Sequence, residues 1–302
     1  MDQASSLRKM VSKKALEANA QISGRGRGSL DFFRMPRVLS VTSGKGGVGK
    51  TNICGNLALA FRSLNKKVLI IDADIGLANI DIIYGISPRY NLSHVLSGEK
   101  ELSEIVCEGP KGIKIIPAGS GFVNYTHLTD GQKLNLLEKF ESLEDLMDIC
   151  LIDTAGGISS NVLYFNVASD ESVVVVTSEP TSITDAYALI KVMSSEYGKT
   201  HFKLIINMVE NVAEAKAVYM KLTNVIDKFL KNVEIEYVGF VPFDQMMKTA
   251  VKNRKPILDM YPTARASMNI KNIASSILNS KRRFDTDGNI KFFMKRFMEL
   301  GK

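Results

Sequence analysis

Short apolar runs, each followed by polar or glycine-rich positions, recur along the chain from residue 37 onward. The runs are too short for typical helices, and most of them have neighbouring apolar residues rather than strict alternation. We therefore expect strands that are buried on both faces, as in a parallel sheet. The predicted strands cover residues 38–42, 67–72, 112–117, 148–153, 172–177, 201–207 and 236–241.

Helix-length segments separate the predicted strands, among them residues 52–64, 181–196 and 212–230. Strands that alternate with helices predict an α/β fold, a doubly wound and mostly parallel sheet flanked by helices. Ligands bind such sheets at the carboxyl ends of the strands. The strongest candidate functional residues of this chain follow predicted strands at that end.

The length of 302 residues suits one domain of this kind with a tail at each end. We predict the domain over residues 37–280. A helix within residues 1–22 would precede it, joined by a flexible linker at 23–36 in which Gly and Arg alternate. Residues 281–302 are predicted to form a basic segment and an amphipathic helix.

The composition argues against several classes of protein. The chain has no apolar run long enough to span a membrane and no apolar signal segment near Met1. Its three cysteines, Cys54, Cys107 and Cys150, stand singly, so we expect reduced thiols in a cytoplasmic protein. The three histidines do not cluster, so no zinc site is indicated.

The net charge of +7 is concentrated in the two tails. Residues 1–37 carry eight Lys or Arg against three Asp or Glu, and residues 281–302 carry seven against three. The remainder is nearly neutral. Such a distribution indicates tails that contact a membrane, nucleic acid or an acidic partner, although a solvated tail kept soluble by its charge remains an alternative.

A glycine-rich loop between a predicted strand and a predicted helix is the most specific motif. Its sequence from Gly44 to Thr51 fits the P-loop pattern G-x-x-x-x-G-K-[ST], in which backbone N–H groups wrap a triphosphate at a helix N-terminus. The side chain of Lys50 would reach the β- and γ-phosphates, and the Thr51 hydroxyl would bind Mg²⁺. The predicted ATP-binding residues here are Gly44, Lys45, Gly46, Gly47, Val48, Gly49, Lys50, Thr51 and Asn52.

Three aspartates follow predicted strands and could complete the site. Asp153 is placed to hold the hydration shell of Mg²⁺, although a helix-capping role is an alternative. Asp72 and Asp74 lie close together in the chain and repel each other, so a nearby cation or the positioning of water would explain both. Because side chains alternate along a strand, these two acids would have different roles.

The sequence GKGGVGKT resembles the deviant Walker A signature of the MinD/ParA ATPases. The resemblance implies a Mg²⁺-dependent ATP hydrolase that binds ATP or ADP and forms an ATP-dependent sandwich dimer. Lys45 would then reach the ATP of the partner subunit and join Lys50 in catalysis.

The family motif D-x-D-x-G also matches, from Asp72 onward. The resemblance places Asp72 near Mg²⁺ and gives Asp74 the role of orienting the attacking water. It likewise places Asn207, Pro242 and Phe243 beside adenine, although these could be ordinary loop residues.

Residues 290–300 have the pattern of an interfacial helix, with a basic face opposite a bulky apolar one. A helix docked on the domain is the alternative. In the MinD branch a short C-terminal helix binds the membrane only in the ATP-bound dimer, and this resemblance implies reversible peripheral attachment to anionic lipid. The predicted membrane-binding residues are Phe293, Met294, Phe297, Met298 and Leu300.

The N-terminus reads D-Q-A-x-x-L-R, with Asp2, Gln3, Leu7 and Arg8 at the characteristic positions. A frayed tail is the simple reading. Joined to a deviant Walker domain, the motif resembles the FlhG family (also called FleN or YlxH), MinD-like regulators of flagellar number. This resemblance implies stimulation of FlhF, a GTPase of the signal-recognition-particle type, with flagellar switch-complex proteins or a flagellar transcription regulator as further partners.

Three alternatives share the nucleotide chemistry. A MinD protein that positions division would lack the N-terminal motif. A ParA-type DNA-binding protein would use basic residues on phosphates, which the nearly neutral domain and the Phe/Met-rich tail do not favour. A nucleotide-dependent interaction module with negligible turnover is the third alternative.

Overall fold

The computed structural model describes residues 35–74, 79–119 and 129–282. The predicted N-terminal helix with its D-Q-A-x-x-L-R motif, most of the predicted linker and the predicted C-terminal amphipathic helix lie outside these residues. Those three predictions, and the domain boundaries drawn with them, therefore stay predictions. Among the described residues, no helix is both long and apolar enough to cross a membrane.

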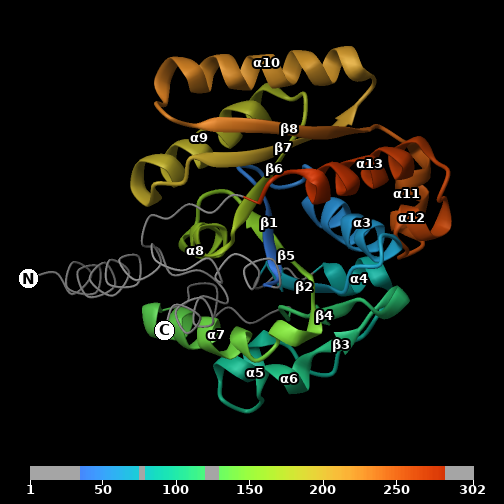
Figure 1. Cartoon of the computed structure of the whole chain (residues 1–302). Coiled ribbons are helices and arrows are strands. Elements are labelled where there is room, and N and C mark those ends of the chain that lie inside the picture. Colours follow the sequence, from blue (N-terminus) through green and yellow to red (C-terminus); the bar gives the residue numbers. More distant parts are fainter. Residues whose placement is uncertain (1–34, 75–78, 120–128, 283–302) are drawn as a thin grey trace, which may run out of the picture.

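A single eight-stranded sheet forms the centre of the molecule (Figure 1). Its spatial order is β3-β4-β2-β5-β1-β6-β7-β8, and every pairing is parallel except that of β3 with β4. The strands are β1 Arg37–Ser43, β2 Val68–Ala73, β3 Cys107–Glu108, β4 Lys114–Ile116, β5 Ile149–Gly156, β6 Glu171–Val176, β7 His201–Val209 and β8 Glu234–Pro242.

Helices cover both faces of the sheet. They are α3 Lys50–Ser63, α4 Ile80–Tyr84, α5 Leu92–Leu96, α6 Leu102–Ile105, α7 Asp130–Glu141, α8 Ser160–Ala168, α9 Pro180–Tyr197, α10 Val212–Phe229, α11 Gln245–Lys252, α12 Ile257–Met260 and α13 Arg265–Asn279, with short 3₁₀ turns at Pro110–Gly112 and Glu144–Leu146. One face packs on α3, α4, α12 and α13. The other packs on α5 to α8 under one half of the sheet and on α8 to α10 under the other.

The predicted doubly wound α/β fold is confirmed, and all seven predicted strands are present. All residues of β1, β2 and β6 are buried, as their largely apolar runs predict. The two-residue edge strand β3 was not predicted, because so short a segment has no pattern of its own. The strand predicted at 112–117 is shorter in the structure, where β4 covers three residues.

The order of the strands places the motifs at one edge of the sheet. Strand β1 lies in the middle, between β5 and β6. The chain leaves β1 toward β2 on one side and later fills β6, β7 and β8 on the other, so the sheet reverses its winding direction beside β1. In open α/β sheets this reversal marks the ligand-binding crevice, at the carboxyl ends of the strands.

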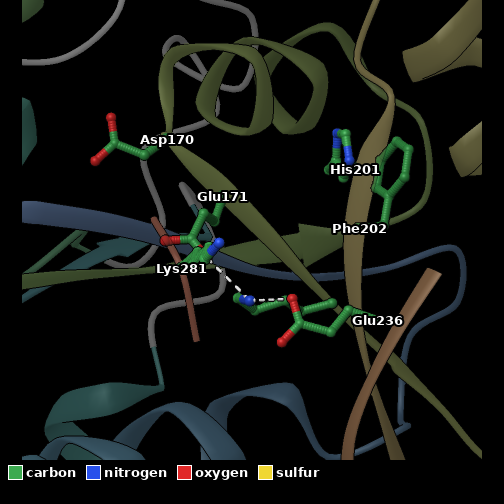
Figure 2. Close-up of a pocket in the computed structure, with 7 residues that line it drawn as sticks. Asp170, Glu171, His201, Phe202, Glu236 and Lys281 are labelled. Carbon is green, nitrogen blue, oxygen red and sulfur yellow. Dashed lines mark hydrogen bonds and ion pairs between the residues drawn. The ribbon is translucent and has the colours of Figure 1, made fainter. Parts of the chain in front are cut away.

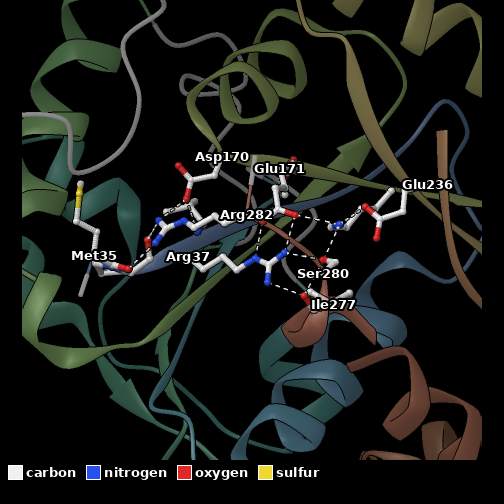
Figure 3. A network of polar contacts seen from close by, with 12 residues as sticks. Met35, Arg37, Asp170, Glu171, Glu236, Ile277, Ser280 and Arg282 are labelled. Carbon is white, nitrogen blue, oxygen red and sulfur yellow. Dashed lines mark hydrogen bonds and ion pairs between the residues drawn. The ribbon is translucent and has the colours of Figure 1, made fainter. Parts of the chain in front are cut away.

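A buried network of charges joins the opposite, amino-terminal ends of the strands (Figure 3). The Arg37 guanidinium donates to both carboxylate oxygens of Glu171, at 2.5 and 2.8 Å. It also donates to the carbonyl oxygen of Ile277 at 2.5 Å, where α13 approaches its end. Lys203 bridges Glu171 and Glu236, with N···O distances of 3.2 and 2.5 Å. These contacts fix α13 to β1, β6, β7 and β8.

Arg282 extends this network and ties together the two ends of the described chain (Figure 3). Its guanidinium donates to the carbonyl oxygens of Met35 and Pro36 and forms an ion pair of 2.8 Å with Asp170. The other contact of Asp170 is with the backbone, since it accepts the N–H of Val38 at 2.9 Å. The residues that precede β1 therefore lie beside those that follow α13.

A pocket beside the network is lined mainly by charged residues, most of which have an ion-pair partner (Figure 2). The Lys203–Glu236 ion pair crosses it, and His201 contacts Glu234 at its rim through an N···O distance of 2.9 Å. The pocket lies at the amino ends of β6, β7 and β8, the edge opposite the P-loop. Since most of its lining charges are already paired, the pocket offers few charged groups to a ligand.

We expect Arg37→Ala to lower the free energy of unfolding by about 2–4 kcal/mol. The change leaves the buried Glu171 carboxylate with Lys203 as its remaining cation, and breaking a buried ion pair from one side is strongly destabilising. Urea denaturation followed by circular dichroism measures the effect. Arg89→Ala, at an exposed position, is the matched control and should change stability by less than about 0.5 kcal/mol. Equal midpoints for the two variants would contradict the role of the network.

Candidate functional site

The P-loop connects the end of β1 to the start of α3. Gly47 and Gly49 have φ values of 82° and 89°, in the left-handed region that glycine adopts without strain. Gly49 is the N-cap residue of α3, so the loop delivers its last backbone N–H groups to the helix N-terminus. This geometry is the ready-made anion site that the sequence predicts.

Neighbouring backbone packs closely against the loop. A Cβ atom on Gly44 would lie 2.0 Å from the carbonyl oxygen of Asp185 in α9. A Cβ atom on Gly156, at the end of β5, would lie 2.7 Å from the backbone nitrogen of Gly46. The N–H of Gly157 donates to the Ser43 carbonyl oxygen at 2.9 Å. The P-loop is thus held between α9 and the loop that follows β5.

Lys50 is buried within this site, with 7% of its surface exposed. Burial lowers the pKa of its ammonium group, and the carboxylates of Asp153 and Asp74 counteract that shift. The structure therefore brings these three predicted residues into one electrostatic group. A cation held here by two nearby acids is placed to meet the phosphates of a nucleotide.

Asp153 is the least satisfied group of the site. Both oxygens of its carboxylate are buried and lack a hydrogen-bond partner within normal limits. Burial raises the pKa of Asp153 well above its usual range, and Asp72 raises it further. The Thr51 hydroxyl and Lys50 act in the opposite direction. A buried carboxylate whose oxygens lack hydrogen-bond partners is stabilised by a nearby cation. The alternative role of Asp153 as a helix cap would not explain these unpartnered oxygens.

Thr51 and Asp153 fit the Mg²⁺ site that the sequence predicts. Mg²⁺ prefers oxygen ligands and is usually held by one or two carboxylates together with the phosphates of its substrate. The orphaned carboxylate of Asp153, next to the hydroxyl at the start of α3, offers such donors. Bound there, the ion would neutralise phosphate charge.

Asp72 lies opposite Asp153 in the register of β2 and β5, and its carboxylate is occupied by backbone. One oxygen accepts the N–H of Asp74 at 3.2 Å, and the other accepts those of Asn79 and Ile80 at 3.0 and 3.2 Å. Burial raises the pKa of Asp72 to about 7, and these three hydrogen bonds oppose the rise. Asp72 thereby joins both ends of segment 74–79, and its predicted place near Mg²⁺ stays a prediction.

Asp74 is partly buried at the start of that segment. Burial raises the pKa of its carboxyl group, and the ammonium of Lys50 lowers it. This electrostatic interaction places the Asp74 carboxyl group near the lysine of the P-loop. This position is compatible with the predicted orientation of an attacking water.

The predicted adenine residues share the same edge at the ends of β7 and β8. Asn207 donates its side-chain N–H to the Val48 carbonyl oxygen at 2.8 Å, so it supports the P-loop directly. Pro242 ends β8, and the N–H of Phe243 donates to the Val209 carbonyl oxygen at 2.8 Å. The Phe243 ring is 51% exposed. The Lys248 ammonium lies over this ring, 4.7 Å from its centroid, and the predicted place of adenine here stays a prediction.

Lys45, the second lysine of the loop, contacts its own chain. Its ammonium lies 2.5 Å from a carboxylate oxygen of Glu179 and 3.0 Å from the Thr181 hydroxyl, at the start of α9. The sequence analysis did not identify these two residues. Glu179 precedes a proline that marks a helix start, but nothing in the local pattern shows that this start faces the P-loop.

The chain is similar to several known proteins. The model of a family described as AAA domain matches residues 36–206. The chain is 39% identical to the antiactivator FleN of Pseudomonas aeruginosa over 87% of its own length and 94% of that protein. It is 37% identical to the flagellum site-determining protein YlxH of Helicobacter pylori, over 80% and 82% of the two chains. The septum site-determining protein MinD of Pyrococcus horikoshii, solved with Mg-ADP, has the same fold, with a TM-score of 0.68, 21% identity and coverage of 81% and 97%.

We expect Asp153→Asn to flatten the dependence of stability on pH in the nucleotide-free protein. The raised pKa of Asp153 means that the folded state binds its proton more tightly than the unfolded state. Stability is therefore lost as pH rises from the unfolded pKa of about 4 toward the raised value. The asparagine variant lacks this loss, so it should exceed the wild type by about 1–3 kcal/mol at pH 8 and by less at pH 5.

Thermal unfolding across this pH range measures the difference. Asp145→Asn, the same change at an exposed position, is the control and should follow the wild-type curve. Stabilisation by Mg²⁺ added with ADP should disappear in Asp153→Asn alone. Parallel pH curves for all three proteins would rule out the buried, unpartnered carboxylate.

Proposed function

Since this chain belongs to the MinD/ParA family of P-loop ATPases, in the FlhG/FleN/YlxH group, we propose that it is a nucleotide-timed regulator of flagellar number and placement. The chain is an ATP hydrolase. The observation that carries the flagellar proposal is its 39% identity to FleN along nearly the whole length of that protein. YlxH, a flagellum site-determining protein, supports the same role.

The chemistry required of the chain is the transfer of the γ-phosphoryl group of ATP to water, giving ADP and phosphate. Such transfer depends mainly on positioning and on stabilising charge. The P-loop N–H groups and Lys50 bind the phosphate oxygens and offset the charge that develops on them. Asp74 accepts a hydrogen bond from the attacking water and aims it at the γ-phosphorus. Thr51 and Asp153 would hold Mg²⁺, which would neutralise charge on the phosphates.

The loop after β5 supplies the link between the nucleotide and the rest of the molecule. Gly156 contacts the P-loop backbone, and Gly157 donates to Ser43, so a γ-phosphate that displaces the P-loop also displaces this loop. Loops that respond to a γ-phosphate in this way are a common form of nucleotide switch. In this proposal the switch controls dimerisation, with Lys45 reaching the nucleotide of the partner subunit.

Dimerisation would allow the C-terminal segment to hold the protein on a membrane. A single short amphipathic helix binds a bilayer weakly, and two helices on one dimer bind much more tightly because the second event is intramolecular. The protein would therefore cycle between a cytoplasmic monomer, free or with ADP, and an ATP-bound dimer on the inner face of the cytoplasmic membrane.

The N-terminal segment would act on the partner proteins. Its D-Q-A-x-x-L-R motif would stimulate the GTPase FlhF. The name of FleN as an antiactivator supports a flagellar transcription regulator among the further partners, and switch-complex proteins are another expectation. Direct binding to DNA is not part of the proposal.

We expect Asp74→Ala to keep ATP binding and to lose hydrolysis. Phosphate release should fall at least about 100-fold, since a group that positions the nucleophile is removed. The variant should also stay on anionic vesicles with ATP but not with ADP in a sedimentation assay. Asp81→Ala, an acidic residue in α4 outside the site, should behave as the wild type. Wild-type turnover in Asp74→Ala, or equal vesicle binding with both nucleotides, would defeat the cycle.

Removal of residues 1–22 should abolish stimulation of FlhF while leaving intrinsic ATP hydrolysis within about twofold of wild type. The segment is outside the P-loop domain, so its loss affects the partner and not the site. GTP turnover by FlhF, measured with the full chain, the truncated chain and a peptide of residues 1–20, gives the answer. A matched peptide with Gln3 and Arg8 replaced by Ala should be inactive. Unchanged GTP turnover with every form would contradict the proposed output.

A further inference from the structure

The hydroxyl group of Thr177 is buried and has no hydrogen-bond partner within the described part of the chain. Thr177 directly follows β6, at the edge of the sheet that holds the P-loop, and 5% of its surface is exposed. A hydroxyl can both donate and accept, and buried polar groups of this kind are nearly always paired. Leaving one unpaired costs free energy, which a contact made on ligand binding would recover.

Alternation along β6 directs this hydroxyl toward the P-loop. The side chain of Val175 packs in the apolar cluster that contains Val48 of the P-loop. The side chain of Val176 packs in a cluster on the opposite face of the sheet. Because side chains two residues apart point to the same face of a strand, Thr177 follows Val175 onto the P-loop side.

Asn207 occupies the matching position on the neighbouring strand. Val176 pairs with Ile206 in the register of β6 and β7. The next residues on the two strands, Thr177 and Asn207, therefore lie at the same level. Asn207 is also buried, and its side chain donates to the carbonyl oxygen of Val48 at 2.8 Å. Of these two polar side chains, one has its partner in the P-loop and the other has none.

The backbone of Thr177 is held in place, whereas the middle of the P-loop has space to turn. The Thr177 N–H donates to the hydroxyl of Ser182, in the first turn of α9, at 3.0 Å. A Cβ atom on Gly46 or Gly47, by contrast, would meet nothing within 4 Å. A change that pairs the Thr177 hydroxyl with the P-loop is therefore a change in the loop.

A bound phosphate would produce such a change. The N–H and C=O bonds of a trans peptide unit point in opposite directions. A loop peptide that turns its N–H to a phosphate thus turns its carbonyl group to the other side, where Asn207 already binds one loop carbonyl.

We propose that Thr177 is a positioning residue of the nucleotide site, whose hydroxyl donates to a P-loop carbonyl oxygen when the polyphosphate of ATP or ADP fills the loop. The new hydrogen bond stabilises the loop in its binding conformation. The inference concerns the ATP site alone and does not depend on which partner the protein regulates.

We expect Thr177→Val to raise the melting temperature of the nucleotide-free protein and to weaken the binding of Mg-ADP. Valine has nearly the same shape without the hydroxyl, so it removes an unpaired group from the free protein and a hydrogen bond from the complex. Calorimetric titration should give a dissociation constant for Mg-ADP about three- to tenfold higher, the range for loss of one hydrogen bond. The KM for ATP should rise by a similar factor while kcat stays within about twofold, since the contact is made before and during phosphoryl transfer.

Two further variants serve as controls. Thr177→Ser keeps the hydroxyl and should bind Mg-ADP as the wild type does. Thr223→Val is the same substitution at a hydroxyl that already donates to the Tyr219 carbonyl oxygen, at 3.0 Å in α10. It should leave the affinity for Mg-ADP unchanged and should not raise the melting temperature.

Wild-type affinity for Mg-ADP in Thr177→Val would overturn the proposal. So would a weaker affinity that Thr177→Ser shares to the same extent, because packing would then be the cause. A melting temperature of nucleotide-free Thr177→Val below that of the wild type would mean that the hydroxyl is already paired, and would overturn the premise. If the valine variant does not fold, Thr177→Ser and Thr177→Ala decide the question, and equal Mg-ADP affinity of these two would count against the hydroxyl.

Discussion

Backbone packs directly on backbone around the P-loop, and this close approach fixes several segments at once. At Gly44 the loop meets α9 with no room for a side chain, and at Gly156 the end of β5 meets the loop in the same way. Asn207 adds a third contact, from β7. Since these neighbours come from separate parts of the sequence, the P-loop cannot change shape alone. A ligand that alters its conformation acts on the start of α9 and on the end of β5 together.

The same edge of the sheet concentrates charge that is unfavourable without a ligand. Asp72 and Asp153 are buried opposite each other, and burial raises the pKa of both carboxyl groups. Three backbone hydrogen bonds offset part of the free-energy penalty of burying the Asp72 carboxylate. The buried oxygens of Asp153 lack such hydrogen bonds. The amino-terminal edge shows the opposite arrangement, because its buried charges alternate in sign and pair fully. The amino-terminal edge of the sheet therefore stabilises the fold, whereas the carboxyl-terminal edge holds charge that a bound ligand could neutralise.

Much of this arrangement could be read from the sequence. Apolar runs predicted the strands, and the carboxyl ends of parallel strands share one edge, so Lys50, Asp74 and Asp153 were expected together. The contacts between segments that lie far apart in the sequence could not be predicted from it. The bond from Asn207 to the P-loop depends on which strands lie near each other, and the pair of Arg37 with Glu171 joins residues 134 positions apart. The backbone contacts of Asp72 depend on a loop path that has no repeating pattern. The motifs in the two tails could be recognised in the sequence, but they lie outside the residues that the structure describes.

Arg282 brings the two ends of the described chain to one place. Its hydrogen bonds to Met35 and Pro36 put the end of the segment that precedes β1 beside the start of the segment that follows α13. Two tails that leave the domain at the same place can bind cooperatively. When one tail binds its target, the effective concentration of the other tail near that target rises. In the proposed cycle one tail binds the membrane and the other binds the partner GTPase. Binding through both tails at once would then require that the two targets occupy the same place.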